Sequence, residues 1–309
     1  MGGQVGSDGG VMDRNGDPDL ATRVFVDHRR LLFTVAYEML GSAADAEDVV
    51  QETWLRWTDV ELDTVRDHRA YLVRIATRQA LNRMRTLSRR KESYVGSWLP
   101  EPLLTAPDVA DDAELADSVS MAMLLVLETL APVERAVFVL REVFDVPYEE
   151  IADAVEKTPA AVRQIAHRAR AHVAARRPRG TTSAAQSRAA LDAFQRAVET
   201  GELQGLFDIL APDVVVLADG GGIRKAVPRP VVGLDKVVRL LAGGLVKAGS
   251  ALSAEAAQVN GAPALLLWQE DDLHSVVTLR IDEDLVTGIY FVRNPEKLLR
   301  MQQQHAVGR

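Results

Sequence analysis

Apolar positions in the first hundred residues recur at intervals of three to four and predict three amphipathic helices. The first spans 19–40 and stops at Gly41. The second starts at Ser42, a residue type that caps helix N-termini, with Asp45 in the capping-box position. The third spans 69–91. Apolar residues at core spacing on the first and third helices are Val24, Leu31, Leu32, Val35, Ala36, Met39, Leu72, Val73, Ala76, Ala80 and Met84.

A second helical stretch, residues 118–177, has the layout of a helix-turn-helix. A support helix over 132–142 precedes a short helix over 147–155 and a three-residue turn. Thr158 and Pro159 then mark the start of the last helix as its cap and first residue.

One side of this last helix is apolar at core spacing, and its other side and flanks are polar. The candidate DNA-contacting residues on this side and its flanks are Ala160, Arg163, Gln164, His167, Arg168 and Arg170. In a major groove, arginine can fork to guanine and glutamine to adenine, a histidine can add a hydrogen bond, and flanking arginines suit phosphates. The alternative is a pair of helices that merely has a basic surface.

Beyond the linker at 179–186, helices are followed by alternating, strand-like segments. Two helices are predicted that break at Gly201, then a strand that runs into the glycines at 220–222, then a helix over 233–248. Four further strands are predicted over 253–260, 262–269, 273–282 and 285–292. This order predicts an α+β cone in which a curved antiparallel sheet encloses a pocket.

Composition restricts the chemistry. The 309 residues include no cysteine, so disulfides and thiolate metal sites are excluded. No apolar run reaches the length of a membrane span, and no apolar leader is recognisable, which predicts a cytoplasmic protein without membrane contact. Residues 1–17, rich in glycine and aspartate, are predicted to be disordered.

The net charge of −8 is unevenly distributed. Residues 66–91 hold nine Lys and Arg against one acid, and residues 163–179 hold six arginines, two histidines and no acid. The segment 96–117 between them holds six acids and no base. Two basic blocks separated by an acidic linker predict two contacts with a polyanion.

Two helices of the first module carry candidate binding surfaces. On the third helix, Arg74, Arg78 and Arg85 form a stripe without interleaved acids, which favours phosphate contact. Tyr71 and His68 are candidates for stacking on exposed bases. The second helix is acidic and favours a basic partner, although a solvated helix face is an equal alternative.

Three motifs resemble those of extracytoplasmic-function sigma factors of bacterial RNA polymerase. They are DAEDVVQETWLRW (45–57), AYLVRIATRQALNRMR (70–85) and YEEIADAVEKTPAAVRQIAHRAR (148–170). The resemblance implies two all-α sigma modules, region 2 over 18–92 and region 4 over 118–178, joined by an acidic, proline-containing linker over 93–117. An α+β domain resembling SnoaL-like cyclases and isomerases follows over 187–309.

The resemblance also implies partners and roles. The second helix would hold the clamp helices of the largest polymerase subunit through Asp45, Glu47, Asp48, Val49, Gln51, Glu52 and Trp54. Promoter DNA would be read at the −10 element by His68, Tyr71, Arg74, Arg78, Asn82 and Arg85. The −35 element would be read by Thr158, Ala160, Arg163, Gln164, His167, Arg168 and Arg170. Tyr71, Arg78 and Asn82 depart from the family's usual Trp, Asn and Asp, which leaves base preference open.

Sigma regions followed by a SnoaL-like domain define a subgroup of this family. Three motifs of this chain resemble hallmarks of that subgroup: WLPEPL (98–103), DGGG (219–222) and NPEKL (294–298). The subgroup implies an extension that regulates the sigma regions in cis. The residues expected to make this contact are Trp98, Leu99, Pro100, Glu101, Pro102, Asp219, Gly220, Gly221, Gly222, Asn294 and Pro295. The alternative is a plain spacer whose Trp98 packs against region 2.

A second function class stays open, a DNA-binding module fused to a ligand-binding or isomerase-like domain. Asp219, His274 and Tyr290 are then candidates for acid, base and oxyanion donor, but they match no catalytic motif. The sequence therefore predicts a protein that is not an enzyme, with no catalytic residue, metal or cofactor. A small ligand in the pocket is left possible.

Overall fold

The computed structural model describes residues 18–105, 120–176, 184–248 and 252–307. The predicted disorder of 1–17 and most of the acidic linker lie outside the described residues. Within the part of the chain that is described, no helix combines the length and the apolar composition that crossing a bilayer requires.

The first module is the predicted three-helix unit: α1 (Pro18–Leu40), α2 (Ala43–Thr58) and α3 (His68–Glu92), with a 3₁₀ turn at Leu62–Thr64. Gly41 ends α1 with a φ of 65°, and the Ser42 hydroxyl caps α2 by accepting from the amide of Asp45 at 3.2 Å. The capping box is not completed as predicted. The Asp45 carboxylate instead accepts a hydrogen bond from Arg83 Nε at 2.7 Å.

The second module contains α5 (Met121–Leu127), α6 (Pro132–Phe138), a π-helical turn (Val139–Val143), α7 (Tyr148–Val155) and α8 (Pro159–Ala174). Glu156 ends α7 in the left-handed conformation, with a φ of 56°. The Thr158 hydroxyl caps α8 by accepting from the amide of Ala161 at 3.2 Å. The helix-turn-helix is therefore present.

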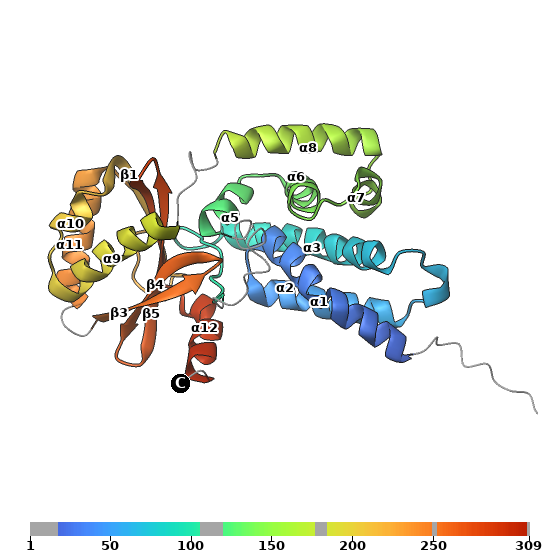
Figure 1. Ribbon diagram of the computed structural model, residues 1–309, viewed down its shortest axis with the longest axis horizontal. Helices are drawn as coiled ribbons and strands as arrows, with labels where there is room; N and C mark the ends of the chain where they lie inside the picture. The colour runs from blue at the N-terminus through green and yellow to red at the C-terminus, as the bar shows by residue number, and fades with distance from the viewer. Residues whose placement is uncertain (1–17, 106–119, 177–183, 249–251, 308–309) are drawn as a thin grey trace, which may run out of the picture.

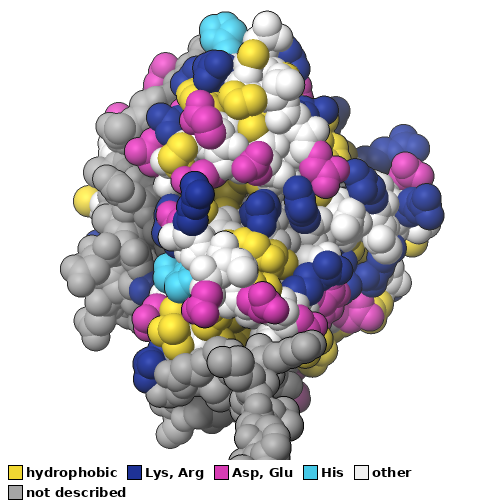
Figure 2. Space-filling view, turned by 90° about the vertical axis from the view of Figure 1, so that its right-hand side faces the viewer, with side chains coloured by type: hydrophobic (Ala, Val, Ile, Leu, Met, Phe, Trp, Pro, Cys, Tyr) yellow, Lys and Arg dark blue, Asp and Glu magenta, His cyan; other side chains and the backbone are white. Residues whose placement is uncertain are grey.

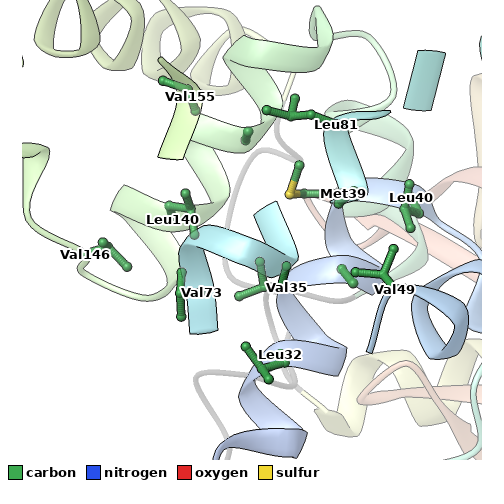
Figure 3. Close-up of a cluster of buried hydrophobic side chains, with 14 of the residues drawn as sticks. Leu32, Val35, Met39, Leu40, Val49, Val73, Leu81, Leu140, Val146 and Val155 are labelled. Carbon is green, nitrogen blue, oxygen red and sulfur yellow. The ribbon is translucent and has the colours of Figure 1, made fainter. Parts of the chain in front are cut away.

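The two modules share one hydrophobic core (Figure 3). Leu140, Val146 and Val155 of the second module lie in the same cluster as Leu32 and Val73 of the first. This contact excludes water over a continuous apolar surface, so the two modules form one compact helical part in this conformation.

The third part is α+β, as predicted, and begins three residues earlier, inside the expected linker. Its elements are α9 (Ala184–Thr200), α10 (Gln204–Phe207), β1 (Leu210–Asp219), β2 (Val231–Val232), α11 (Leu234–Ala248), β3 (Leu252–Val259), β4 (Ala262–Gln269), β5 (Asp272–Asp282), β6 (Leu285–Val292) and α12 (Pro295–Val307). We call this part the sheet domain.

The sheet of this domain has the strand order β2-β1-β6-β5-β4-β3. Strands β3 to β6 form an antiparallel meander. The prediction of an antiparallel sheet is wrong for one pair of strands, because β1 pairs in parallel with β6. The first strand joins the sheet beside the last one and runs in the same direction.

The two faces of the sheet have different neighbours (Figure 1). One face is covered by α9 and α11 through Phe194 and Val237. The other face looks toward the helical part, and its core includes Leu99 of the inter-module segment, Met121 of α5 and Leu298 of α12. Residues from outside the strands therefore complete the second core of the sheet domain.

Candidate functional site

The last helix of the helix-turn-helix presents its predicted DNA-reading residues to solvent. Thr158, Ala160, Arg163, Gln164, His167, Arg168 and Arg170 are all exposed. The guanidinium of Arg163 lies 3.7 Å from Glu149, with side chains 53% and 70% exposed. An exposed ion pair of this kind contributes little. The helix face is thus available for a major groove.

The aromatic residues at the start of α3 are more enclosed than predicted. The rings of His68 and Tyr71 pack on Trp57, with centroid distances of 5.5 and 5.9 Å. The Arg74 guanidinium lies 4.6 Å from the Tyr71 ring centre. These three residues are half-buried, so stacking of His68 or Tyr71 on a base requires this packing to rearrange.

Arg78 corrects the expectation of an unpaired arginine stripe on α3. Its guanidinium donates to the carbonyl oxygen of Asp153 at 2.8 Å and lies 3.5 Å from the Glu156 carboxylate. Both partners belong to the second module. Asn82 and Arg85 are exposed and bonded to each other, at 2.9 Å.

Figure 2 views the helical end of the molecule, and Lys and Arg side chains cross the middle of this face with Asp and Glu on both sides. This face is therefore not a continuous basic surface of the kind expected for a bound polyanion.

The acidic helix α2 is only partly a surface. Val49 is 1% exposed and Asp45 is 8% exposed, so both belong to the interior rather than to a partner contact. Asp48 also pairs with Arg83. Trp54 packs on Phe25, with ring centroids 4.9 Å apart.

Of the residues on α2 predicted to contact the polymerase, Asp48, Gln51 and Glu52 are exposed and Glu47 is half-buried. Glu47 pairs with Arg29 of α1 at 2.8 Å and lies 3.6 Å from Arg300 of α12. The C-terminal helix of the sheet domain therefore reaches the predicted polymerase-binding helix.

The inter-module segment 94–105, which we call the strap, is fixed at one end by a buried carboxylate. Asp219 is 0% exposed. Its Oδ1 accepts from the Tyr94 hydroxyl at 2.6 Å and the Gly221 amide at 3.0 Å. Its Oδ2 accepts from the Leu99 amide at 2.9 Å and Lys297 Nζ at 2.7 Å. Four donors, two from the strap and two from the sheet domain, thus compensate the burial of this carboxylate.

The surroundings of the two side-chain donors, Tyr94 and Lys297, shift their pKa values. Burial raises the pKa of Tyr94 above its ordinary value, and the adjacent Asp219 adds to this shift, so the hydroxyl keeps the proton that it donates. Burial lowers the pKa of Lys297, although Asp219 favours its charged form. Lys297 also donates to the carbonyl oxygen of Leu99.

The middle of the strap is held by the helical part through Glu101. Glu101 Oε2 accepts from the Ala43 amide at 2.8 Å and the Ser42 hydroxyl at 3.3 Å, at the N-terminus of α2. Its own amide donates to the carbonyl of Gly41 at 2.8 Å. Burial raises the pKa of Glu101, against the lowering effect of these backbone donors.

Sequence reasoning missed two further residues, Tyr37 and Asn260, which link the strap to the helical part and to the sheet domain. The Tyr37 hydroxyl of α1 donates to the carbonyl of Glu101 at 2.6 Å and accepts from Asn260 Nδ2 at 2.6 Å. The Asn260 amide donates to the carbonyl of Leu103 at 2.8 Å. No local pattern marks either residue, because their partners lie far away along the chain.

The aromatic and apolar residues of the strap contact both parts. A Cβ on Gly41 would lie 2.8 Å from the Trp98 ring. Lys91 Nζ lies 3.5 Å and Lys297 Nζ 4.2 Å from the ring centre. Leu99 is fully buried in the sheet-domain core, and Pro100 and Pro102 are buried. Trp98 therefore contacts both the first module, through Gly41 and Lys91, and α12 of the sheet domain, through Lys297, while its neighbour Leu99 enters the sheet-domain core.

The glycines after β1 permit this contact. Gly221 has a φ of 64°, and a Cβ there would lie 2.4 Å from Cγ of Asn294. Asn294 Nδ2 donates to the Tyr94 hydroxyl at 2.9 Å, and Pro295 opens α12. A Cβ on Gly220 would lie 2.1 Å from the Arg224 carbonyl oxygen, and one on Gly222 3.3 Å from Val95.

The three candidate catalytic residues do not share a site. Asp219 is enclosed by the strap. His274 lines a cavity on the face of the sheet covered by α9 and α11. Tyr290 belongs to the core on the opposite face. The acid, base and oxyanion arrangement suggested by the sequence is therefore wrong.

Known proteins resemble this chain over most of its length. The Sigma-70 region 2 family matches residues 24–90, and the Sigma-70, region 4 family matches residues 120–173. The ECF RNA polymerase sigma factor SigJ of Mycobacterium tuberculosis is 37% identical over 240 residues, which cover 75% of this chain and 76% of SigJ. The probable ECF RNA polymerase sigma factor SigI of that organism is 33% identical over 274 residues, covering 88% and 92%. The crystal structure of SigJ matches with a TM-score of 0.72 at 31% identity, covering 90% of this chain and 98% of that chain.

Proposed function

The chain belongs to the extracytoplasmic-function (ECF) sigma factors of RNA polymerase, and we propose that its sheet domain regulates it in cis through the strap. As a sigma factor it binds the polymerase core and directs promoter-specific transcription initiation. Its place of action is then the cytoplasm. In the proposed cycle, the described conformation is the closed state, and an open state binds the polymerase core.

The buried Asp219 carboxylate is the observation that carries this proposal. It joins the strap, through Tyr94 and Leu99, to Lys297 of the sheet domain's own α12 in one network. If the strap leaves, a buried charge loses its donors, so the contact is favourable only when complete. Because the contact is favourable only when it is complete, it suits a switch between two states, one with the strap bound and one with the strap released.

The surfaces that the closed state occupies also support the proposal. Arg78, one of the six residues proposed to read the −10 element, bonds to the carbonyl of Asp153 in region 4. At the polymerase-binding helix, Glu101 occupies the N-terminus of α2 and Arg300 lies beside Glu47. Opening would free these groups together, whereas the −35 residues on α8 are exposed throughout.

We test this with two aspartates of the same strand. Asp219→Ala removes the acceptor of the network and leaves Lys297 without its partner, which costs about 3 kcal/mol in comparable buried pairs. Asp213→Ala changes an exposed aspartate of β1. We expect Asp219→Ala to bind core polymerase about tenfold more tightly than wild type, within the range of coupling energies between sites. Asp213→Ala should match wild type.

Hydrogen exchange at the Leu99 amide shows whether the strap has been released. Faster exchange together with unchanged core binding and unchanged promoter-specific transcript would contradict regulation through this contact. The sigma-factor identity does not depend on that outcome, because it rests on regions 2 and 4.

A further inference from the structure

The sheet domain contains a cavity of about 170 Å³, open on one side, between the sheet and the helices α9 and α11. Most of its lining is apolar and includes Phe194, Leu206, Val216, Leu241, Leu267 and Phe291. An apolar cavity of about 150 Å³ is large enough to hold a benzene molecule. The cavity therefore has room for an apolar group of about six non-hydrogen atoms.

Two nitrogen-bearing side chains, His274 and Arg293, interrupt this apolar lining. The Arg293 guanidinium donates to the Lys225 carbonyl oxygen at 2.6 Å and to His274 Nε2 at 2.9 Å. Within the described residues, no carboxylate lies at ion-pair distance from Arg293, whereas its neighbour Arg224 pairs with Asp272. Arg293 thus brings a positive charge to the cavity without a matching negative one.

Each of these side chains also keeps an unused donor. Arg293 Nε and His274 Nδ1 are buried and have no hydrogen-bond partner among the described residues. An arginine can only donate, so His274 Nε2 must accept from it, and this network places the imidazole proton on Nδ1. Burial, with Arg293 and Arg224 adding to it, lowers the pKa of His274 and keeps the ring neutral despite Asp272.

A buried donor without an acceptor is costly, and an unpaired buried charge more so. We propose that this cavity is a binding site for a small carboxylic acid in its ionised form. The carboxylate accepts hydrogen bonds from Arg293 and His274, and an apolar body of about six carbons fills the space between the sheet and α11. Inorganic anions do not fit this site, because they leave the apolar walls without contacts.

The binding claim goes beyond the regulation proposed above and does not depend on it. The location nevertheless connects the two. The Arg293 amide donates to the carbonyl oxygen of Asp219 at 2.7 Å. The next residue, Asn294, bonds to the Tyr94 hydroxyl. A ligand held by Arg293 would therefore lie one residue from the strap contact.

Titration calorimetry on the full chain tests the proposal with three probes: hexanoate, hexanamide and inorganic phosphate. We expect saturable binding of hexanoate, at least about tenfold tighter than that of hexanamide, since one charge-assisted hydrogen bond is worth about that factor. Phosphate should give no saturable binding. In parallel, NMR should show that hexanoate raises the pKa of His274, because a carboxylate beside the ring favours its charged form.

Two variants separate charge from space. Arg293→Gln should weaken hexanoate binding about tenfold and leave hexanamide binding unchanged. Gly244→Leu keeps every charge but places a side chain at the cavity lining. A Cβ at Gly244 meets nothing within 4 Å, so this variant should fold and should abolish binding of both probes.

The proposal is overturned if hexanoate and hexanamide bind equally well, or if neither binds. It is also overturned if Gly244→Leu binds hexanoate as wild type does, or if phosphate alone saturates the site. Because Gly244→Leu does not touch Arg293, it remains decisive even if Arg293→Gln fails to fold. An intact Leu99 amide exchange rate in every variant would show that the strap contact is not involved in these results.

Discussion

The contact between the two helical modules and the contact between the strap and the sheet domain are built from different interactions. The first is a shared apolar core that joins Leu140 and Ile151 of region 4 to Val73 of region 2. The second contains one buried leucine, Leu99, but is dominated by hydrogen bonds to Asp219 and Asn260 of the sheet domain.

These two constructions respond differently to change. Apolar burial is non-directional and roughly proportional to area, so it weakens gradually as atoms are removed. A hydrogen-bonded charge depends on a few atoms, and removing one partner leaves another group unsatisfied. The polar contact is therefore the one that a single modification or ligand can switch, and the apolar contact sets the stability against which it switches.

The largest expected effect comes from the apolar contact. Ile151 of α7 is 0% exposed, and Ile151→Ala should lower the free energy of unfolding by about 3 kcal/mol, through lost burial and the cavity that remains. Urea unfolding followed by circular dichroism measures this. Leu55→Ala, at a side chain that is 64% exposed, is the control and should change little.

Hydrogen exchange on the same variant shows where the stability is lost. Because the core is continuous, protection should fall in both helical modules together. The Leu99 amide should keep its protection relative to neighbouring sites. Loss confined to region 4 would mean that the two modules do not share a cooperative core.

Sequence patterns predicted the elements well wherever the information is local. Apolar spacing gave α1 to α3 and α8, and cap residues such as Ser42 and Thr158 gave helix starts. The alternating segments of the last third gave strands β3 to β6. These predictions succeed because helix and strand periods are properties of neighbouring residues.

The predictions that failed concern residues whose partners lie far away in the chain. Val49 sits in an acidic motif but packs inward, and Arg78 sits in a basic stripe but bonds to region 4. Tyr37 and Asn260 lie 223 positions apart and still share a hydrogen bond. The parallel pairing of β1 with β6 was likewise missed, since no short-range pattern encodes it. The helix α12 was missed although Pro295 at its first position is a local start signal.

A medium effect is expected from a pair of glycines that differ only in their neighbours. Gly221 and Gly201 have φ values of 64° and 77°, so alanine at either position costs about 1 kcal/mol in backbone strain. A Cβ on Gly201 meets nothing within 4 Å, whereas one on Gly221 would displace Asn294 from Tyr94. Gly221→Ala should therefore cost about 1 kcal/mol more in unfolding free energy than Gly201→Ala.

The Leu99 amide again separates the two variants. It should exchange faster in Gly221→Ala and be unchanged in Gly201→Ala. Equal exchange rates in the two proteins would mean that Asn294 is not needed to keep the strap in place, and the polar contact would then rest on Asp219 and Asn260.

The smallest effect is expected at the edge of the same contact. Arg300 of α12 lies 3.6 Å from Glu47, with side chains 34% and 23% exposed. Such a pair is worth at most about 0.5 kcal/mol, so Arg300→Gln should leave thermal stability unchanged and tighten core-polymerase binding by no more than about twofold. The gain should vanish at high salt, where exposed charges are screened.

Arg29→Gln frees the same carboxylate within region 2 and should leave the Leu99 amide unaffected. If Arg300→Gln instead opened the strap as fully as Asp219→Ala, the contact would be held by diffuse charge attraction rather than by directed hydrogen bonds, and its difference from the apolar core would be one of degree.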